Sequence, residues 1–398
     1  MDEVPSGYKR TEVGVIPEDW VVARIDEYYD VISSKRVLQR DWKSRGVPFY
    51  RAREVAVLAE KGVVDNELFI TEDLYLTLKS KYGVPKVGDA LVTGIGTIGK
   101  VYTVSPDNMF YFKDASVLWL KSRGGYSSEF LKQVFLTDII VKQIKNSSMG
   151  TTVETYTIQS AKKTLVPTPS LEEQRAIATA LSDVDALITA LDKLIAKKRA
   201  IKTAAMQQLL TGKTRLPGFS GEWETKRLGD IAHIQTGSKN NQDKVEGGQY
   251  PFFVRSETVE RIDSYSYACE AILVPGEGGI GSIFHYINGR FDVHQRVYAI
   301  TQFASNVSGK FVYLYMTNHF GAHAMRNTVK ATVDSLRLPA FQSFEIRMPP
   351  TLDEQTAIAQ VLSDMDAEIA ALEARRDKTR AIKQGMMQQV LTGRVRLV

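Results

Sequence analysis

A long internal repeat limits the possible folds more than any other feature of the sequence. Residues 171–216 (LEEQRAIATALSDVDALITALDKLIAKKRAIKTAAMQQLLTGKTRL) return at 352–397 as LDEQTAIAQVLSDMDAEIAALEARRDKTRAIKQGMMQQVLTGRVRL, and 27 of the 46 aligned positions are identical. Similarity at a fixed offset indicates that one structural unit occurs twice. We therefore expect the chain to fold as two copies of one arrangement.

The regions that precede the two repeats are related more weakly. PFYRAREV (48–55) resembles PFFVRSETV (251–259), and LVTGIGTIGKVY (91–102) resembles LVPGEGGIGSIF (273–284). Trp20 and Arg24 likewise have counterparts in Trp223 and Arg227. The offset falls from 203 to 182 between these landmarks, so the first region contains about 21 additional residues. We predict a globular domain at 1–168, a long helix at 169–212, a second globular domain at 213–349 and a second long helix at 350–398.

The repeat is also circular. The first copy continues from TGKTRL into PGFSGEW, whereas the second copy ends at TGRVRLV and the N-terminus supplies the related segment GVIPEDW. If the C-terminal tail lies near the N-terminal segment, the two halves become equivalent. The sequence therefore predicts this contact and a pseudo-twofold internal repeat.

The repeated segments are predicted to be long helices. Each follows a proline and starts with a capping box, Ser170-x-x-Glu173 or Thr351-x-x-Glu354, and each ends near a glycine, Gly212 or Gly393. About 40 helical residues extend roughly 60 Å. Apolar residues at 4-3-4-3 spacing predict a coiled-coil seam. The seam comprises Ile177, Leu181, Val184, Ile188, Leu191 and Ile195 in the first helix, and Ile358, Leu362, Met365, Ile369 and Leu372 in the second.

The charges of these helices favour antiparallel pairing. In both helices acidic residues come first and basic residues follow, so only antiparallel pairing places opposite charges together. The alternative is two separate amphipathic helices, each covering its own domain. Short β-rich runs bounded by Gly, Pro, Asn and Asp predict strands in both globular domains, and apolar stretches at 130–144 and 311–327 predict helices. The expected fold class is α+β, with two mixed domains held apart by two long antiparallel helices.

Composition excludes several classes of protein. The chain has 398 residues, 43% hydrophobic side chains and a net charge of +5, values that are ordinary for a globular protein and only mildly favour polyanions. Its single cysteine, Cys269, excludes an internal disulfide bond and a multi-cysteine zinc site. The sequence lacks a signal peptide and an apolar stretch of membrane-spanning length, so we expect a cytoplasmic protein without a membrane anchor.

No catalytic centre is evident. The glycine clusters 94–99 and 276–281 match the dinucleotide pattern G-x-G-x-x-G, but β-branched and aromatic runs follow them where a helix is required. His319 and His323 have a zinc-binding spacing but no nearby third ligand, so packing or surface roles are favoured. An adenine methylase loop and Walker motifs are absent as well. We predict no cofactor, metal or catalytic residue in this chain.

Two divergent domains, each followed by a helix that opens with P-x-L-x-E-Q and closes with QQLLTG or QQVLTG, resemble the specificity subunits of type I restriction–modification systems. GTIGK (96–100), VHQRVY (293–298) and PSLEEQRAI (169–177) also look like stretches of that family. The resemblance covers essentially the whole chain. It implies a non-catalytic subunit whose two target recognition domains each read one half of a bipartite, asymmetric double-stranded DNA site.

The resemblance also implies partners. Two methyltransferase subunits would bind the long helices and bring S-adenosylmethionine, and restriction subunits would bring translocation and cleavage that depend on ATP and Mg. One alternative is a stand-alone bipartite DNA-binding protein or scaffold without methyltransferase partners. The other is a cofactor-binding enzyme built on the glycine clusters, which the missing helices disfavour.

Polar loops supply the predicted DNA contacts, because Arg, Lys, Asn and Gln read base edges and basic or hydroxyl groups hold phosphates. A surface role without DNA contact remains the alternative for each residue. In the first domain the candidates are Lys35, Arg36, Arg40, Lys43, Arg45, Lys79, Lys81 and Tyr82. In the second domain they are Ser238, Lys239, Asn240, Asn241, Lys244, Arg326 and Lys330.

Overall fold

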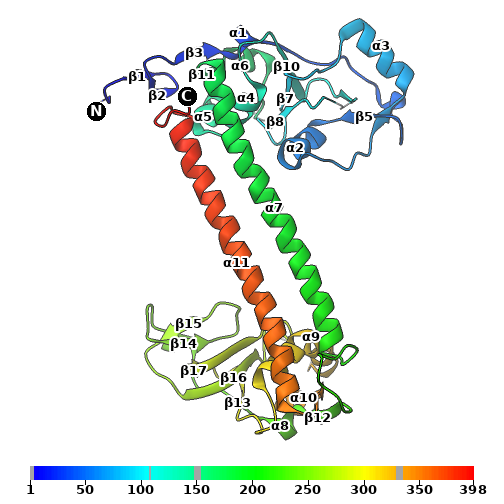
Figure 1. The fold of residues 1–398 in the computed structure, drawn as a ribbon, viewed down its shortest axis with the longest axis vertical. Helices are drawn as coiled ribbons and strands as arrows, with labels where there is room; N and C mark the ends of the chain where they lie inside the picture. Colours follow the sequence, from blue (N-terminus) through cyan, green and yellow to red (C-terminus); the bar gives the residue numbers. More distant parts are fainter. Residues whose placement is uncertain (1–3, 107–108, 148–153, 329–334) are drawn as a thin grey trace. The chain divides into compact units, whose positions relative to one another are not determined.

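A computed structural model describes residues 4–106, 109–147, 154–328 and 335–398, which form two compact units (Figure 1). Unit 1 comprises residues 1–190 and 376–398, and unit 2 comprises residues 191–375. Both boundaries fall inside the long helices, so each unit contains part of each helix. Both units mix strands and helices, which confirms the predicted α+β class.

Unit 1 is built on two small sheets and two strand pairs. The strands of the four-stranded sheet, in spatial order, are β4 (Tyr29–Ile32), β10 (Val117–Ser122), β7 (Ala90–Thr93) and β8 (Val101–Thr103), with antiparallel neighbours. The three-stranded sheet contains β6 (Phe69–Ile70), β5 (Val47–Tyr50) and β9 (Tyr111–Phe112). The strand pairs are β1 (Tyr8–Thr11) with β2 (Gly14–Pro17), and β3 (Val21–Arg24) with β11 (Leu165–Thr168).

The helices of unit 1 surround these strands. They are α1 (Ile25–Tyr28), α2 (Ala52–Lys61), α3 (Glu72–Tyr82), α4 (Ser128–Val134), α5 (Asp138–Ser147) and α6 (Ile158–Lys163). The helix predicted at 130–144 is thus two helices with a break between them. The main hydrophobic core of the unit joins strand residues such as Val92 and Leu120 to Ile177 and Leu181 of the first long helix. The start of that helix is therefore an integral part of the unit.

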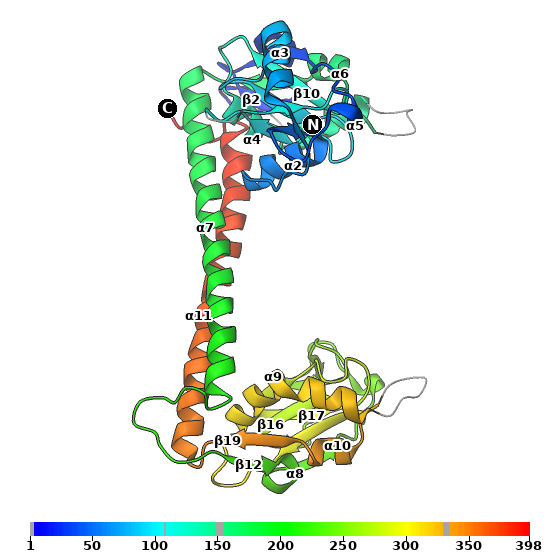
Figure 2. The ribbon, with the colours of Figure 1, turned by 90° about the vertical axis from the view of Figure 1, so that its right-hand side faces the viewer.

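Unit 2 has one larger sheet. Its six strands, in spatial order, are β13 (His233–Thr236), β18 (Val297–Thr301), β16 (Tyr267–Pro275), β17 (His285–Val293), β14 (Tyr250–Phe253) and β15 (Glu260–Ile262). A separate pair joins β12 (Glu224–Arg227) to β19 (Glu345–Met348). The helices are α8 (Leu228–Ile231), α9 (Gly309–Asn327) and α10 (Leu338–Gln342), and α9 packs against β16 (Figure 2).

The elements of the two units correspond in chain order. A strand and a short helix open each unit (β3 and α1, β12 and α8), and a strand that pairs with the opening strand closes it (β11, β19). Between them, β5 pairs in parallel with β9 as β14 pairs in parallel with β17. Unit 1 inserts α2 and α3 between β5 and β7, which accounts for the additional residues predicted in the first domain. The internal repeat is confirmed at the level of individual elements.

The two long helices are α7 (Leu171–Leu209) and α11 (Leu352–Val390), each 39 residues long. At 1.5 Å per residue each extends about 58 Å. In unit 2, Arg199 bonds Glu373 and Lys202 bonds Asp366, each at 2.5 Å. The later residue of α7, Lys202, thus pairs with the earlier residue of α11, Asp366. This order confirms antiparallel pairing. In unit 1, Lys383 of α11 lies 2.7 Å from Asp185 of α7.

The predicted seam residues have different surroundings. Ile177 and Leu181 belong to the core of unit 1, and Ile358 and Leu362 belong to the core of unit 2. These residues join the helices to their domains. Of the other predicted seam residues, Leu191, Ile195 and Ile369 are buried, and Val184, Ile188, Met365 and Leu372 are half-buried.

The C-terminal tail of unit 1 contacts the N-terminal segment, as the circular repeat predicts. The Tyr8 hydroxyl donates to the Gly393 carbonyl at 3.1 Å. Arg396 donates to Glu173 at 2.5 and 2.8 Å and to Asp19 at 3.0 and 2.8 Å. The Trp20 indole also donates to Glu173, whose side chain is fully buried. We call Arg396, Glu173, Asp19 and Trp20 the unit 1 latch.

Unit 2 contains the equivalent contact without a chain break. Arg215, which follows α7, donates to the buried Glu354 of α11 through Nε and Nη2, both at 2.5 Å. Its guanidinium lies 6.0 Å from the Trp223 ring. Both glutamates were predicted to belong to capping boxes, and their backbone N–H groups do donate to Ser170 and Thr351. Their carboxylates, however, bind arginines from the end of the other long helix.

The glutamine after each of these glutamates joins its long helix to its domain. Gln174 Nε2 donates to the Pro169 carbonyl, and its Oε1 accepts from the Ser127 N–H at 2.8 Å. Gln355 repeats both contacts, with the Pro349 carbonyl and the Ser308 N–H. The E-Q pair of the repeated motif therefore has a structural role in both units. Within the described residues, no helix combines the length and the apolar character that crossing a bilayer requires.

Candidate nucleic-acid interface

The two predicted polar loops occupy equivalent places in their units. Residues 33–45 connect β4 to β5, and residues 236–244 begin at the end of β13 and lead towards β14. Each loop contains one short 3-10 turn, at Gln39–Asp41 and at Asn241–Asp243. Because β4 and β13 are corresponding strands, the fold places both loops at the same edge of their respective sheets.

In unit 1 the structure brings predicted residues of the loop 33–45 close to those at the end of α3. The Lys35 ammonium lies 5.1 Å from the centroid of the Tyr82 ring at the end of α3. The Lys35 backbone N–H donates to the Tyr111 hydroxyl at 3.0 Å, which anchors the loop to β9. Tyr82 is half exposed, so its ring offers a flat surface beside a cation. Such a pair can stack on a base or face a phosphate.

The other unit 1 candidates lie on the surface around this pair. Arg36 bonds Asp114 at 3.0 Å, and the Lys43 backbone pairs with Phe69. Arg40 lies in the 3-10 turn, and Arg45, Lys79 and Lys81 are exposed. These positions are accessible to a polyanion, and nothing in the structure selects among them.

In unit 2 several predicted residues also have structural contacts. The Lys239 ammonium lies 3.9 Å from the fully buried Asp292 carboxylate, and the Lys239 backbone bonds Val293 and Gln295. Asn240 accepts a hydrogen bond from Gln295 at 2.5 Å. Lys239 therefore compensates a buried charge, whatever else it contacts.

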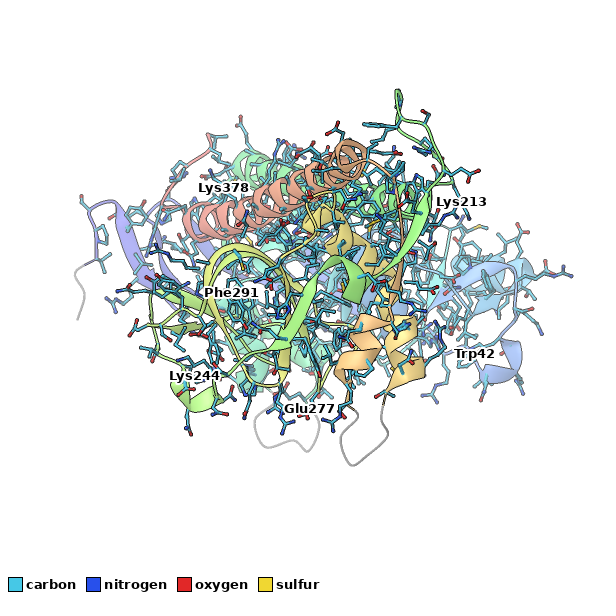
Figure 3. The ribbon with its side chains drawn as sticks, turned by 90° about the horizontal axis from the view of Figure 1, so that it is seen from below. Trp42, Lys213, Lys244, Glu277, Phe291 and Lys378 are labelled. Atoms are coloured by element: carbon cyan, nitrogen blue, oxygen red, sulfur yellow. The ribbon has the colours of Figure 1, made fainter. Side chains whose placement is uncertain are left out.

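The remaining unit 2 candidates differ in exposure and in neighbours. Lys244 lies 3.6 Å from Glu260, and Figure 3 labels it at the edge of the unit. Ser238 and Asn241 are exposed, and Arg326 is exposed in the last turn of α9. Lys330 lies outside the described residues.

The sequence does not predict a cluster of charged residues that lies beside the loop 236–244 of unit 2. Glu277, labelled in Figure 3, lies in the glycine turn after β16. Its carboxylate contacts Arg255 Nη1 at 3.4 Å and Arg296 Nη1 at 3.2 Å. We call Arg255, Glu277 and Arg296 the arginine triad. The three residues come from different loops, so only the pairing of β14, β16, β17 and β18 brings them together. The runs that contain Arg255 and Arg296 are visible in the sequence, but their proximity is not.

A cavity of about 370 Å³ adjoins the arginine triad. Its lining is polar or charged except for Val254 and Gly278, and includes Asn241 and Ser256. His294 lies two residues before Arg296, and its Nδ1 accepts a hydrogen bond from the Arg296 backbone N–H at 3.0 Å. Burial, followed by the charges of Arg255 and Arg296, lowers the pKa of His294 below its ordinary value. The imidazole is therefore neutral near pH 7, as its acceptor role requires.

The same region of unit 1 has a different character. The glycine turn there places Ile95 at the position of Glu277. A cavity of about 330 Å³ lies beside it, and its lining combines apolar residues, among them Ala115, Leu118 and Ile158, with uncharged polar residues such as Ser33 and Gln159. The two units thus present chemically distinct surfaces on equivalent elements.

The glycine turns themselves are structural. β8 follows the first turn and β17 follows the second, so a pyrophosphate would meet no helix N-terminus. A Cβ atom on Gly94 would lie 2.6 Å from the Tyr156 carbonyl oxygen. On Gly276 it would lie 2.9 Å from the Tyr298 ring. Close chain packing therefore requires glycine here, and the dinucleotide interpretation is excluded.

The two spaced histidines bond to backbone groups. The ring of His319 contacts the Tyr315 carbonyl at 3.0 Å, and that of His323 contacts the Ala340 carbonyl at 2.8 Å. Both rings also pack against aromatic side chains. Across the part of the chain that the structure describes, no three His, Cys, Asp or Glu side chains are placed to hold a metal ion together.

Comparisons with known proteins agree on one protein family. A family model described as the type I restriction modification DNA specificity domain matches residues 17–202 and again 220–380. The MjaX protein of Methanocaldococcus jannaschii, a candidate type I restriction enzyme specificity subunit, is 24% identical over 98% of this chain and 97% of its own length. The EcoDI specificity subunit of Escherichia coli is 29% identical over 43% of this chain and 37% of its own length.

A solved structure shares the fold. The S subunit of the M. genitalium type I restriction–modification system superimposes with a TM-score of 0.65 at 15% identity, over 93% of this chain and 96% of that chain.

Proposed function

The chain belongs to the type I restriction–modification DNA specificity family, and from this premise we propose that its two units read the two halves of a split DNA target. It is a DNA sequence-specificity subunit. Specificity subunits have no catalytic activity of their own. Its contribution is therefore the choice of the sites on which partner subunits act.

The observation that supports two reading units is the repetition of elements with divergent loops. Both units share the chain order of corresponding elements and equivalent polar loops, but Ile95 and Glu277 occupy the same position in the glycine turn. Base edges are distinguished by side-chain donors, acceptors and apolar groups. Two units with the same scaffold and different side chains are therefore suited to two different half-sites, which gives an asymmetric bipartite target.

We further propose that α7 and α11 set the unread spacer and bind methyltransferase subunits. As a type I specificity subunit, the chain works in a complex with methyltransferase and restriction subunits on DNA. Exposed apolar residues on the long helices, Leu187, Leu194, Ile201 and Ile382, support a role in protein contacts. Ile201 of unit 2 and Ile382 of unit 1 are equivalent positions of the repeat, which favours two methyltransferase subunits. S-adenosylmethionine, ATP and Mg would bind those partners, and this chain would hold no cofactor.

Selection of DNA by the assembled complex tests this function. The full chain is co-purified with its methyltransferase subunit and incubated with a library of random duplexes, and the bound duplexes are sequenced. We expect two short conserved segments separated by a fixed length of unselected sequence. Enrichment of one continuous segment, or of no segment despite a stable complex, would contradict the proposal.

A further inference from the structure

We propose that the arginine triad of unit 2 recognises two G·C base pairs in the major groove, with Arg255 and Arg296 each reading one guanine. This inference rests on the proposed function, because it names what one of the two reading units recognises. None of the residues chosen from the sequence as DNA contacts belongs to the triad.

The triad has a half-buried side and an exposed side. The Glu277 side chain is 21% exposed, whereas the side chains of Arg255 and Arg296 are 47% and 51% exposed. The carboxylate thus lies behind the two guanidinium groups and holds both through their Nη1 atoms. An arginine fixed in this way loses less conformational entropy when it binds a ligand.

The remaining donors suit a guanine edge. A guanidinium has five N–H donors in a rigid plane. Glu277 contacts Nη1 of each arginine, and among the described residues no hydrogen bond engages Nε or Nη2, so these donors remain available. Two parallel N–H groups of arginine match O6 and N7 of guanine, which is the commonest specific contact in the major groove.

The carboxylate favours a base pair over a phosphate. A phosphate placed between the arginines would lie close to Glu277, and the two negative charges would repel. A base edge carries no net charge, so a guanine in the same place meets no such repulsion. The polar cavity of about 370 Å³ beside the triad leaves room for such an edge.

The shared fold does not require the triad. The latches and the E-Q contacts occur in both units, as expected of structural features. The triad occurs in unit 2 alone. Gly94 bonds the Ser116 carbonyl as Gly276 bonds the Arg296 carbonyl, so Ser116 occupies the place of Arg296. Unit 1 therefore has neither the glutamate nor this arginine, and a role specific to unit 2 follows.

Hydrogen bonds hold the backbone of the two turns that carry Glu277 and Arg296. The Arg296 N–H donates to His294 Nδ1, and its carbonyl accepts from the Gly276 N–H at 2.9 Å. The turn that presents Arg296 is thus bonded to the turn that presents Glu277. This rigidity fits a reading role, because base recognition needs fixed donor positions.

Methylation mapping of arginine variants tests the inference. The full chain, or its Arg255→Ala, Arg296→Ala or Arg255→Lys variant, is expressed with the methyltransferase subunit, and N6-methyladenine is located by single-molecule sequencing. We expect one half-site of the parent motif to contain two invariant G·C pairs. Each alanine variant should reduce discrimination at one such position by roughly 5- to 150-fold. The lysine variant should retain only part of the discrimination, because a flexible, compact ammonium lacks the rigid planar donors of a guanidinium that Glu277 holds in place.

Arg347→Ala is the matched control, because Arg347 is exposed on β19, outside the six-stranded sheet. It should leave the motif unchanged, and co-purification with the partner shows that every variant folds. A parent motif in which neither half-site contains two invariant G·C pairs would overturn the inference. So would alanine variants that weaken methylation equally at all sites, which is the result expected of phosphate contacts. A parent protein with no split motif would contradict the proposed function itself.

Discussion

At the scale of single residues, the clearest result is that both units use the same buried ion pair to join the two long helices. Arg396 with Glu173 and Arg215 with Glu354 are equivalent pairs, and each glutamate is buried. The partners are separated by 223 and 139 residues along the chain. Local sequence patterns therefore identify both glutamates as capping residues but do not reveal their arginine partners.

Removing the latch arginine should destabilise unit 1. Arg396→Ala leaves the Glu173 carboxylate buried with fewer donors, which costs free energy. Because the Arg396 side chain is 37% exposed, we expect a modest loss of about 2 kcal/mol in the free energy of unfolding. Urea unfolding followed by circular dichroism measures the loss.

The neighbouring Arg394 is exposed and serves as the control for this variant. Arg394→Ala should unfold at the same urea concentration as the parent. Equal stability of the Arg394→Ala and Arg396→Ala proteins would show that the latch does not stabilise the unit.

The stability that the unit 1 latch contributes should also depend on pH, because of Asp19. The hydrogen bond from Arg396 lowers the pKa of Asp19 below its ordinary value of 3.8. A carboxylate whose pKa is lowered by folding stabilises the native state above its unfolded pKa, and this contribution is lost as the pH falls through the folded pKa. Asp19→Asn should therefore reduce stability at pH 7, and its difference from the parent should shrink below about pH 4. An equal difference at pH 7 and pH 3 would rule out this origin.

At the scale of elements, hydrophobic periodicity and turn residues predicted most of the architecture. The runs around ALVT, VYT, VLWLK and VYAI are strands β7, β8, β10 and β18, and both long helices lie where the repeat placed them. Spacing alone could not separate helix–helix contacts from helix–domain contacts. Ile177 and Ile358 have seam spacing but pack in domain cores.

For the same reason, the candidate interface could be predicted only in part from the sequence. The loops 33–45 and 236–244 were recognisable as polar loops, because their composition is local information. The arginine triad depends on strand pairing across the sheet of unit 2, which brings Arg255, Glu277 and Arg296 together from three loops. Non-local contacts of this kind need the fold before the site becomes visible.

Helix α11 contains one residue that lowers its stability. Gly385 lies inside the helix, and a Cβ atom built on it meets no atom within 4 Å. Glycine costs about 1 kcal/mol relative to alanine in a helix interior. Gly385→Ala should therefore raise the free energy of unfolding by about 0.5–1 kcal/mol, as measured by urea unfolding.

Gly94→Ala is the matched contrast for Gly385→Ala. Its Cβ would lie 2.6 Å from the Tyr156 carbonyl oxygen, so this substitution should destabilise the protein. If both alanine variants shifted stability in the same direction, the proposed difference between an open and a packed glycine would be wrong.

At the scale of the whole molecule, the long helices are proposed to set the spacing between half-sites. Ala190 and Arg375 are the positions at which α7 and α11 pass from one compact unit to the other. Four residues inserted after each would lengthen both helices by about 6 Å while leaving both units intact. We expect the unread spacer to grow by one or two base pairs, with both half-sites unchanged, as read by methylation mapping.

A seven-residue insertion at the same two places is the control, because it adds one complete heptad and so keeps the same face of each helix towards its partner, unlike four residues. It lengthens each helix by about 10 Å. It should lengthen the spacer further. An unchanged spacer with altered half-sites in either variant would show that the helices do not determine the separation.

The central claim is that the two units read different halves of one target, and a comparison of two methylation maps tests it most directly. One protein has Lys35→Ala and Arg36→Ala in the polar loop of unit 1, and the other has Arg255→Ala and Arg296→Ala in the arginine triad of unit 2. Each is expressed with the methyltransferase subunit, and N6-methyladenine is mapped in genomic DNA. Our account predicts that the two proteins lose base discrimination in opposite halves of the motif and keep the same spacer. Loss in the same half, or across both halves in each protein, would contradict it.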